Sequence, residues 1–228
     1  NRSIYIEMYH KIGTIKPIKW YTMLTKKQLK LLGPFLANIF KEYGQRELGR
    51  LAHEKSSNAV QLAIKQFEHE KIVTSRNVGT SKLYRINFDN ELSYDYLSLL
   101  KYEGLPKAVL QSIETLKEEI EKYLLFYSLV IFGSYAVGKQ HAKSDLDVAL
   151  IIPDKAHEKN MKIAETMAKL KSLLSLHVQI ITFNEMFEML TNKEANVGKE
   201  IARKHRVVHN VNIFYKIVRR ALEHGFNY

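Results

Sequence analysis

The sequence contains no cysteine, and this absence narrows the chemistry that its 228 residues can perform. Disulfide frameworks, thiol nucleophiles and zinc sites with sulfur ligands are excluded, which leaves His, Asp and Glu as metal ligands. Apolar runs of about 18 residues, the length of a membrane-spanning helix, are also missing, so we expect no membrane partner. Because no secretion signal is evident and the sequence starts at Asn1 rather than Met, we expect a cytoplasmic protein that has lost an initiating segment.

Positive charge exceeds negative charge in both halves of the sequence, but most of the excess lies in the first. There are 35 Lys and Arg residues against 24 Asp and Glu residues, a formal net charge of +11. Residues 1–110 carry 18 basic and 10 acidic side chains, whereas residues 111–228 carry 17 and 14. A basic excess of this size favours polyanionic partners such as nucleic acid or nucleotides.

The first part of the sequence predicts a small helical module that follows an irregular arm. Residues 1–23 have aromatic and β-branched side chains but no helical period, so we expect an extended arm there. Thr25 is a candidate N-cap for a helix that Gly33-Pro34 should bend or divide, and Gly44 should end this element. Residues 45–71 then predict two short helices, the second capped by Ser57, and residues 72–86 predict a β-hairpin around Gly79.

This order of elements resembles the winged helix-turn-helix domains of bacterial and archaeal regulators, and the segment QRELGRLAHEKSSNAVQLAIKQFEHEKIVTSRNVGTSKLYRI carries the resemblance. It implies that residues 24–104 form a winged helix that binds duplex DNA or another nucleic acid. A dimerisation or protein-binding module has a similar solvated face, so a homodimer or a partner protein is the alternative. The candidate DNA-binding residues are Ser57, Asn58, Gln61 and Lys65 on the recognition helix and Arg76, Lys82 and Arg85 in the wing.

The remaining sequence, residues 105–228, alternates apolar runs with helical patterns. A connecting helix is expected near residues 108–122, followed by strands near residues 127–132, 145–152 and 177–183. A helix is expected between His157 and Leu174, and two closing helices near residues 193–206 and 212–223. We therefore expect an α+β protein in which the winged helix precedes a mixed α/β sheet domain with closing helices.

One motif in this second domain contains the candidate catalytic residues. Gly133-Ser134 follows a buried strand, and ten residues later comes Asp145-Leu146-Asp147. A glycine at a strand end lets the backbone approach a phosphate closely, and a helix N-terminus that follows it attracts the anion. Two aspartates that alternate on a strand leave the same face, with backbones about 6.6 Å apart, and such a pair can bridge divalent cations.

This motif resembles the active site of the DNA polymerase β-like nucleotidyltransferase superfamily, and most closely its minimal nucleotidyltransferase branch. Residues 105–228 look similar to archaeal members that carry an N-terminal winged helix. The resemblance implies that ATP or another nucleoside triphosphate is the substrate and that Mg²⁺ or Mn²⁺ is the cofactor. It makes Asp145 and Asp147 the metal-binding catalytic residues and makes Gly133 and Ser134 nucleotide-binding residues. Members often have an Arg after Gly-Ser, which is missing here, so Lys139 and Lys143 are the candidates for pairing with phosphate.

A second departure concerns the third carboxylate that the superfamily places on a later strand. The matching position in HVQIITF is Gln179, an amide that binds metal weakly and cannot act as a general base. The resemblance implies transfer of a nucleoside monophosphate, AMP from ATP, to a hydroxyl of a macromolecule, and it suggests a HEPN-type partner protein as acceptor. The alternative is a DNA-binding transcriptional regulator whose second domain only binds nucleotide.

Two further features of the closing segment remain as weaker interpretations. His205 and His209 have the i, i+4 spacing with which a helix can bind zinc, although no third ligand is evident. A basic cluster in the same segment is either a contact for a nucleotide or acidic acceptor or, as we prefer, a solvated helix face. Its members are Lys199, Arg203, Lys204 and Arg206.

Overall fold

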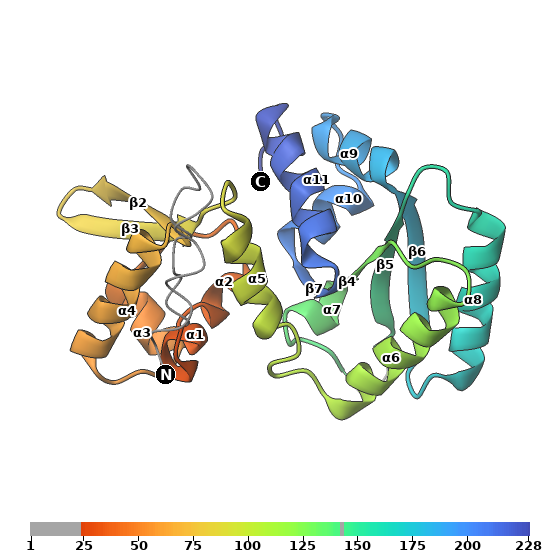
Figure 1. Ribbon diagram of the computed structural model, residues 1–228, viewed down its shortest axis with the longest axis horizontal. Coiled ribbons are helices and arrows are strands. Elements are labelled where there is room, and N and C mark those ends of the chain that lie inside the picture. Colours follow the sequence, from red (N-terminus) through yellow and green to blue (C-terminus); the bar gives the residue numbers. More distant parts are fainter. Residues whose placement is uncertain (1–23, 142–143) are drawn as a thin grey trace, which may run out of the picture.

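The computed structural model describes residues 24–141 and 144–228. The expected arm at residues 1–23 and Lys143 lie outside this range. Within it, no helix is both long enough and apolar enough to cross a membrane. The described residues form an N-terminal helical module with a small sheet and a C-terminal domain with a larger sheet, side by side in Figure 1.

The N-terminal module packs four short helices against a three-stranded antiparallel sheet. Its strands lie in the order β1-β3-β2, so the hairpin of β2 and β3 is extended by the short β1. The elements in chain order are α1 (Lys26–Lys30), α2 (Gly33–Ala37), β1 (Tyr43–Gly44), α3 (Gln45–Leu51), α4 (Ser57–His69), β2 (Val73–Val78) and β3 (Ser81–Ile86).

Local signals explain most of these boundaries. Thr25 caps α1 in a capping box with Gln28, and the expected division at Gly33-Pro34 separates α1 from α2. The residue that caps α4 is Ser56, whose hydroxyl accepts a hydrogen bond from the Ala59 amide, so the cap predicted at Ser57 was wrong by one residue. Both serines suit a cap, and the chain uses the first of them.

The linker between the two modules contains a helix that the sequence analysis did not predict. Helix α5 (Glu91–Leu99) is capped by Asn90 and packs against the last helix of the chain, α11 (Val211–Glu223). The ring of Tyr94 in α5 stacks on that of Tyr215 in α11, with centroids 4.9 Å apart. Helix α5 therefore connects the modules through a buried aromatic contact.

The C-terminal domain is built on a four-stranded mixed sheet in the order β6-β5-β4-β7. Strands β5 and β6 are parallel, and β4 is antiparallel to both β5 and β7. The elements are α6 (Lys107–Glu121), β4 (Ser128–Phe132), α7 (Gly133–Ala136), β5 (Leu146–Ile152), α8 (Glu158–Lys171), β6 (Leu176–Thr182), α9 (Phe183–Thr191), α10 (Val197–Arg203), β7 (His205–His209) and α11.

Helices cover both faces of this sheet. Helices α6 and α8 pack on one face, against the buried side chains of Leu146, Val148 and Leu150. Helices α9, α10 and α11 cover the other face, where Ala149 and Ile151 are buried (Figure 1). Because successive residues of β5 point to opposite faces, Asp147 shares the side of Ala149 and Ile151.

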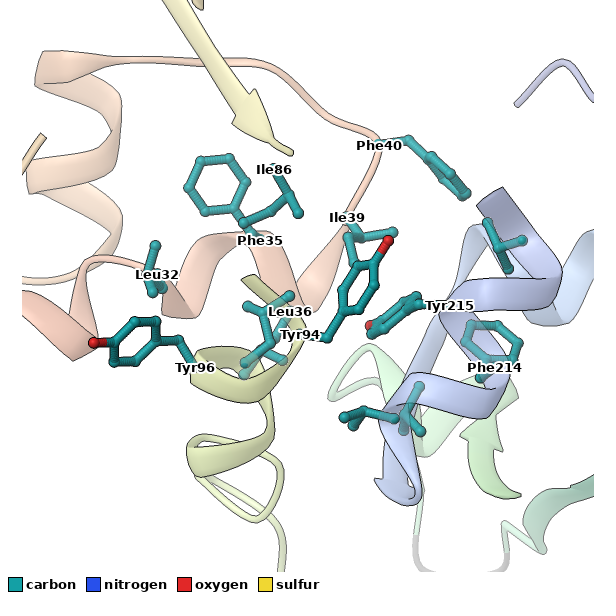
Figure 2. Packing of buried hydrophobic residues seen from close by; sticks show 14 of the residues in the cluster. Leu32, Phe35, Leu36, Ile39, Phe40, Ile86, Tyr94, Tyr96, Phe214 and Tyr215 are labelled. Carbon is teal, nitrogen blue, oxygen red and sulfur yellow. The ribbon is translucent and has the colours of Figure 1, made fainter. Parts of the chain in front are cut away.

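A single buried cluster continues from the N-terminal module into the C-terminal domain. It runs from Leu32 and Phe35 past Tyr94 to Tyr215 and Phe214 on α11 (Figure 2). Phe40 adds a second link, because its ring stacks on that of Tyr228 with centroids 4.2 Å apart. The C-terminal residues of the chain therefore lie against the N-terminal module.

The closing helix expected at residues 193–206 is shorter than predicted at both ends, because α10 begins only at Val197. Helix α10 ends at Arg203, and residues 205–209 form β7, an edge strand paired with β4. The β-branched pair Val207-Val208 is buried in the sheet. β-Branched residues favour strands, so this pair was the local signal of a strand between the two helices.

Candidate active site

The candidate site begins with the turn that follows β4. Gly133 has φ +66°, a left-handed conformation that strains any residue with a side chain. A Cβ atom at this position would lie 2.4 Å from Oδ2 of Asp147. The backbone of the Gly-Ser turn therefore lies directly against the second aspartate of the motif, and only glycine permits that approach.

The two aspartates of the motif lie where β5 starts. Asp147 is the second residue of β5 and its side chain is 28% exposed, whereas Asp145 precedes the strand and is exposed. Leu146, between them, is fully buried on the opposite face. The alternation of the strand thus directs both carboxylates away from the α6–α8 core and toward solvent. They lie at one edge of the sheet, the edge at which β5 and β6 start and β4 ends.

Strand β6 brings two further polar residues to the same edge. His177 is the register partner of Asp147, and its Nδ1 atom lies 3.0 Å from the carboxylate Oδ1. The Nε2 atom of Gln179 lies 3.0 Å from His177 Nε2. The amide NH₂ can only donate, so this contact fits a neutral imidazole that accepts at Nε2 and donates its Nδ1 proton to Asp147.

His177 is a site residue that the sequence analysis did not single out. It shares a strand face with Gln179, because the two residues are two apart on β6. The signal that could have identified it was the register of β5 and β6, since a parallel pairing that starts near Leu146 and Leu176 places His177 beside Asp147. A single sequence does not show that register.

The donor set suits a Mg²⁺ ion that arrives with a nucleotide. Among the described residues, no group of three or more His, Asp or Glu side chains could hold a metal by itself. Mg²⁺ retains several waters and is usually bound by one or two carboxylates together with substrate phosphates. The exposed Asp145 and the partly exposed Asp147 are donors of this type, and their exposure leaves room for water and phosphate.

The remaining predicted phosphate contacts are less well defined. The backbone amide of Lys139 closes the turn by donating to the Ser134 carbonyl at 3.0 Å, while the Lys139 side chain is exposed. The helix expected after Ser134 has only four residues, α7, so its dipole is much weaker than that of a full helix. Backbone proximity at Gly133, rather than a helix dipole, is the stronger feature of this turn.

The predicted contacts for nucleic acid lie on an exposed face of the N-terminal module. Two of the three wing cations are already in ion pairs: Arg76 with Glu42 at 2.5 Å and Lys82 with Glu68 at 2.7 Å. The hydrogen bond from Arg76 lowers the pKa of Glu42. Ser57, Asn58, Gln61 and Lys65 are exposed on α4, as expected for its polar face, and Leu62 and His69 of the same helix are exposed as well.

The hypothesis of a zinc-binding histidine pair was wrong. His205 and His209 lie on β7 rather than on a helix, and a strand separates residues four apart by about 13 Å. His205 is buried, its Nε2 lies 3.1 Å from the Tyr215 hydroxyl, and burial lowers its pKa to about 4. His209 stacks on Tyr127 with ring centroids 4.5 Å apart. Both histidines are therefore packing residues.

The basic cluster of the closing segment is not the uniform solvated face that we preferred. Lys199 is buried, and its ammonium donates to the carbonyls of Asn192 and Glu194. Arg206 donates to the Glu103 carbonyl. Arg203 and Lys204 remain exposed between them, at the junction of α10 and β7.

Comparisons with known proteins agree with this geometry. Residues 114–207 match the family described as polymerase beta, nucleotidyltransferase. The protein adenylyltransferase MntA of Shewanella oneidensis is 32% identical over 89 residues, which are 39% of this chain and 60% of that protein. The chain therefore spans about three fifths of the length of this relative. The matched region extends from α6 into β7 and includes Gly133, Asp145, Asp147 and Gln179, so this part of the C-terminal domain is similar to polymerase beta nucleotidyltransferases.

Proposed function

We propose that the protein transfers a nucleoside monophosphate, AMP from ATP, to a hydroxyl group of a macromolecular acceptor. In this reaction the hydroxyl oxygen forms a bond to the α-phosphorus, the bond from that phosphorus to the β-phosphate oxygen breaks, and pyrophosphate leaves. The acceptor hydroxyl loses its proton to water or to a basic group. The observation that supports this proposal most strongly is the close approach of the Gly133 backbone to Asp147.

In this proposal the aspartates bind the metal ion, and the Gly133 turn and nearby lysines bind the nucleotide. Asp145 and Asp147 would hold Mg²⁺ or Mn²⁺, whose charge screens the carboxylates from the triphosphate and polarises the α-phosphate. Gly133, Ser134, Lys139 and Lys143 would bind the nucleotide.

A transfer assay tests the proposal: label from α-labelled ATP should appear on the acceptor, whereas label from γ-labelled ATP should not. The reverse pattern would indicate phosphoryl transfer and contradict it.

For the acceptor, we propose a protein. The name of the relative, protein adenylyltransferase, supports this choice, and the resemblance to minimal nucleotidyltransferases suggests a HEPN-type partner. The competing function is a regulator whose second domain binds nucleotide without turnover. Gln179 favours that alternative, because an amide cannot accept a proton from the acceptor hydroxyl.

Replacing Gln179 with Asp should increase nucleotidyl transfer about 10-fold at saturating Mg²⁺. Gln179 shares the strand face of His177, which contacts Asp147. A carboxylate there would strengthen metal binding and provide a base for the acceptor hydroxyl. Initial rates with α-labelled ATP and the identified acceptor measure the effect.

Gln179→Asn is the matched control, because it shortens the side chain to the length of Asp without adding charge. The Asn variant should be no faster than the wild-type protein. If the Asp variant is also no faster, Gln179 is not at the catalytic position or the site works without a third carboxylate.

We further propose that residues 24–104 are a winged helix-turn-helix that recruits duplex DNA. The order of two short helices followed by a hairpin supports this, as does the exposed polar face of α4. The hairpin of β2 and β3 extends away from the C-terminal domain in Figure 1, which leaves it accessible to a large ligand.

The full chain should bind duplex DNA with an affinity that falls steeply with salt, because bound cations displace counterions from phosphates. Lys65→Ala and Arg85→Ala should each reduce the slope of log affinity against log salt by about 0.9. Neither side chain is in an ion pair within the described part of the chain. Arg76→Ala is the internal comparison and should reduce the slope less, because Glu42 already balances its charge. No binding at low salt would identify the module as a protein-interaction domain.

A further inference from the structure

A cavity of about 560 Å³ lies between the N-terminal module and the nucleotidyltransferase domain. Phe40 and Lys41 line it from the N-terminal module, and the C-terminal Tyr228 closes it beside Phe40. Val137, which follows α7, and the pair Arg203 and Lys204 line it from the nucleotidyltransferase domain. Its volume is within the range of small-ligand pockets.

The register of the sheet places this cavity beside the Gly133 turn. Strands β4 and β7 are antiparallel, and Phe132 is paired with His205. Gly133 follows Phe132 and Lys204 precedes His205, so both residues leave the sheet at the same edge on neighbouring strands. The contact between α7 and β7 agrees with this placement.

The candidate site residues therefore lie side by side along this edge of the sheet, in the order of the strands. Gln179 lies on β6, Asp147 on β5, the Gly133 turn after β4, and Lys204 just before β7. Neighbouring strands are about 4.8 Å apart. If the α-phosphate of a triphosphate is held at Asp147 and the next phosphate at Gly133, the chain of phosphates points toward β7 and the cavity.

The charges at this end of the order suit a phosphate tail. Arg203 and Lys204 are exposed and, within the described part of the chain, make no ion pair. Lys41, on the opposite wall, is balanced by Glu47 at 2.8 Å. Two cations without a carboxylate partner remain on the wall next to the turn. A guanidinium can bind phosphate with two parallel hydrogen bonds, and an ammonium adds a point charge.

We propose that Arg203 and Lys204 bind the β- and γ-phosphates of the nucleoside triphosphate, the part that leaves as pyrophosphate. This inference rests on the proposed nucleotidyltransferase site and assigns its leaving-group end. The pair supplies the positive charge that the sequence lacks directly after Gly133-Ser134. It also makes the N-terminal module a wall of the site, because Lys41 and Phe40 line the same cavity.

Calorimetric titration of the full chain with AMP, ADP and ATP in Mg²⁺ tests this assignment. In the variant Arg203→Ala with Lys204→Ala, the affinity for ATP should fall about 10-fold or more, the affinity for ADP should fall less, and that for AMP should not change. Inorganic triphosphate should compete with ATP for the wild-type protein and should not compete for the variant.

Lys155→Ala with Lys159→Ala is the control, because both lysines are exposed and follow the far end of β5. This variant loses the same charge and should keep the wild-type ATP affinity. An unchanged ATP affinity in the Arg203 and Lys204 variant would overturn the assignment, as would an equal loss for AMP, ADP and ATP. Loss of binding to a single-stranded oligonucleotide with unchanged ATP binding would assign the cavity to nucleic acid and also overturn it. Failure of the proposed function is distinct, since the wild-type protein would then transfer no label from α-labelled ATP to an acceptor, whatever its affinity for ATP.

Discussion

Gly133→Ala should reduce nucleotidyl transfer by at least about 100-fold while the protein remains folded. The added Cβ would lie 2.4 Å from Asp147 Oδ2, so the carboxylate or the turn must move. The left-handed backbone of Gly133 adds strain of about 1–2 kcal/mol for a residue with a side chain. Catalytic sites tolerate displacements of this kind poorly, because an error of about 1 Å can cost about 100-fold in rate. The measurement is the initial rate of transfer from α-labelled ATP.

Gly104→Ala is the control that separates the effect of backbone strain from the effect of displacing Asp147. Gly104 also has a left-handed backbone, with φ +74°, but a Cβ there would meet no atom within 4 Å. It precedes α6, outside the proposed site. This variant should lose some stability, measured as a lower Tm, and should retain transfer activity at temperatures where it is folded. Equal activity losses in the two variants would show that backbone strain, rather than the position of Asp147, determines the effect.

The sequence was sufficient to predict the Asp145 and Asp147 edge because two short-range rules apply there. A buried strand alternates its side chains, which assigns Asp147 to one face and Leu146 to the other. A glycine at the end of the preceding strand is needed when the backbone approaches another group. Both rules depend on residues close in sequence. The structure shows the alternation at Leu146 and Asp147, and it places the Gly133 backbone against the Asp147 carboxylate.

The parts that could not be predicted depend on pairing between distant segments. His177 reaches Asp147 only because β6 is parallel to β5 in one particular register. Residues 204–206 were expected to end a helix, but residues 205–209 pair with β4 and form the edge strand β7. The pairing of β7 with β4 also brings Arg203 and Lys204 to the Gly133 turn. From the sequence these residues were part of a basic cluster on an expected helix, whereas in the structure they form a candidate site for phosphate.

The same reasoning explains why α5 was not predicted. Its sequence, ELSYDYLSL, has a weak helical period, and the helix packs against α11, which is distant in sequence. Tyr94 is buried against Tyr215, and burial raises the pKa of both hydroxyls. Tertiary packing of this kind commonly outweighs local propensity.

Asp145→Asn with Asp147→Asn should abolish Mg²⁺-dependent binding of ATP and should reduce nucleotidyl transfer by at least about 1,000-fold, because Mg²⁺ and the charges it screens are the main source of stabilisation at such a site. The fold should persist, because Asp145 is exposed and the Asp147 side chain is 28% exposed. Glu114→Gln with Glu118→Gln removes the same charge from exposed positions on α6 and is the control. That variant should bind ATP as the wild-type protein does.

Calorimetric titration of ATP with and without Mg²⁺ is the most direct test of the proposed site. In the wild-type protein, Mg²⁺ should increase the affinity for ATP, because the carboxylates repel the triphosphate unless a cation lies between them. In the double aspartate variant this increase should disappear, and binding without Mg²⁺ should be at least as strong as in the wild-type protein because the repulsion has been removed. An unchanged Mg²⁺-dependent increase in the variant would contradict the assignment of Asp145 and Asp147 as the metal-binding residues.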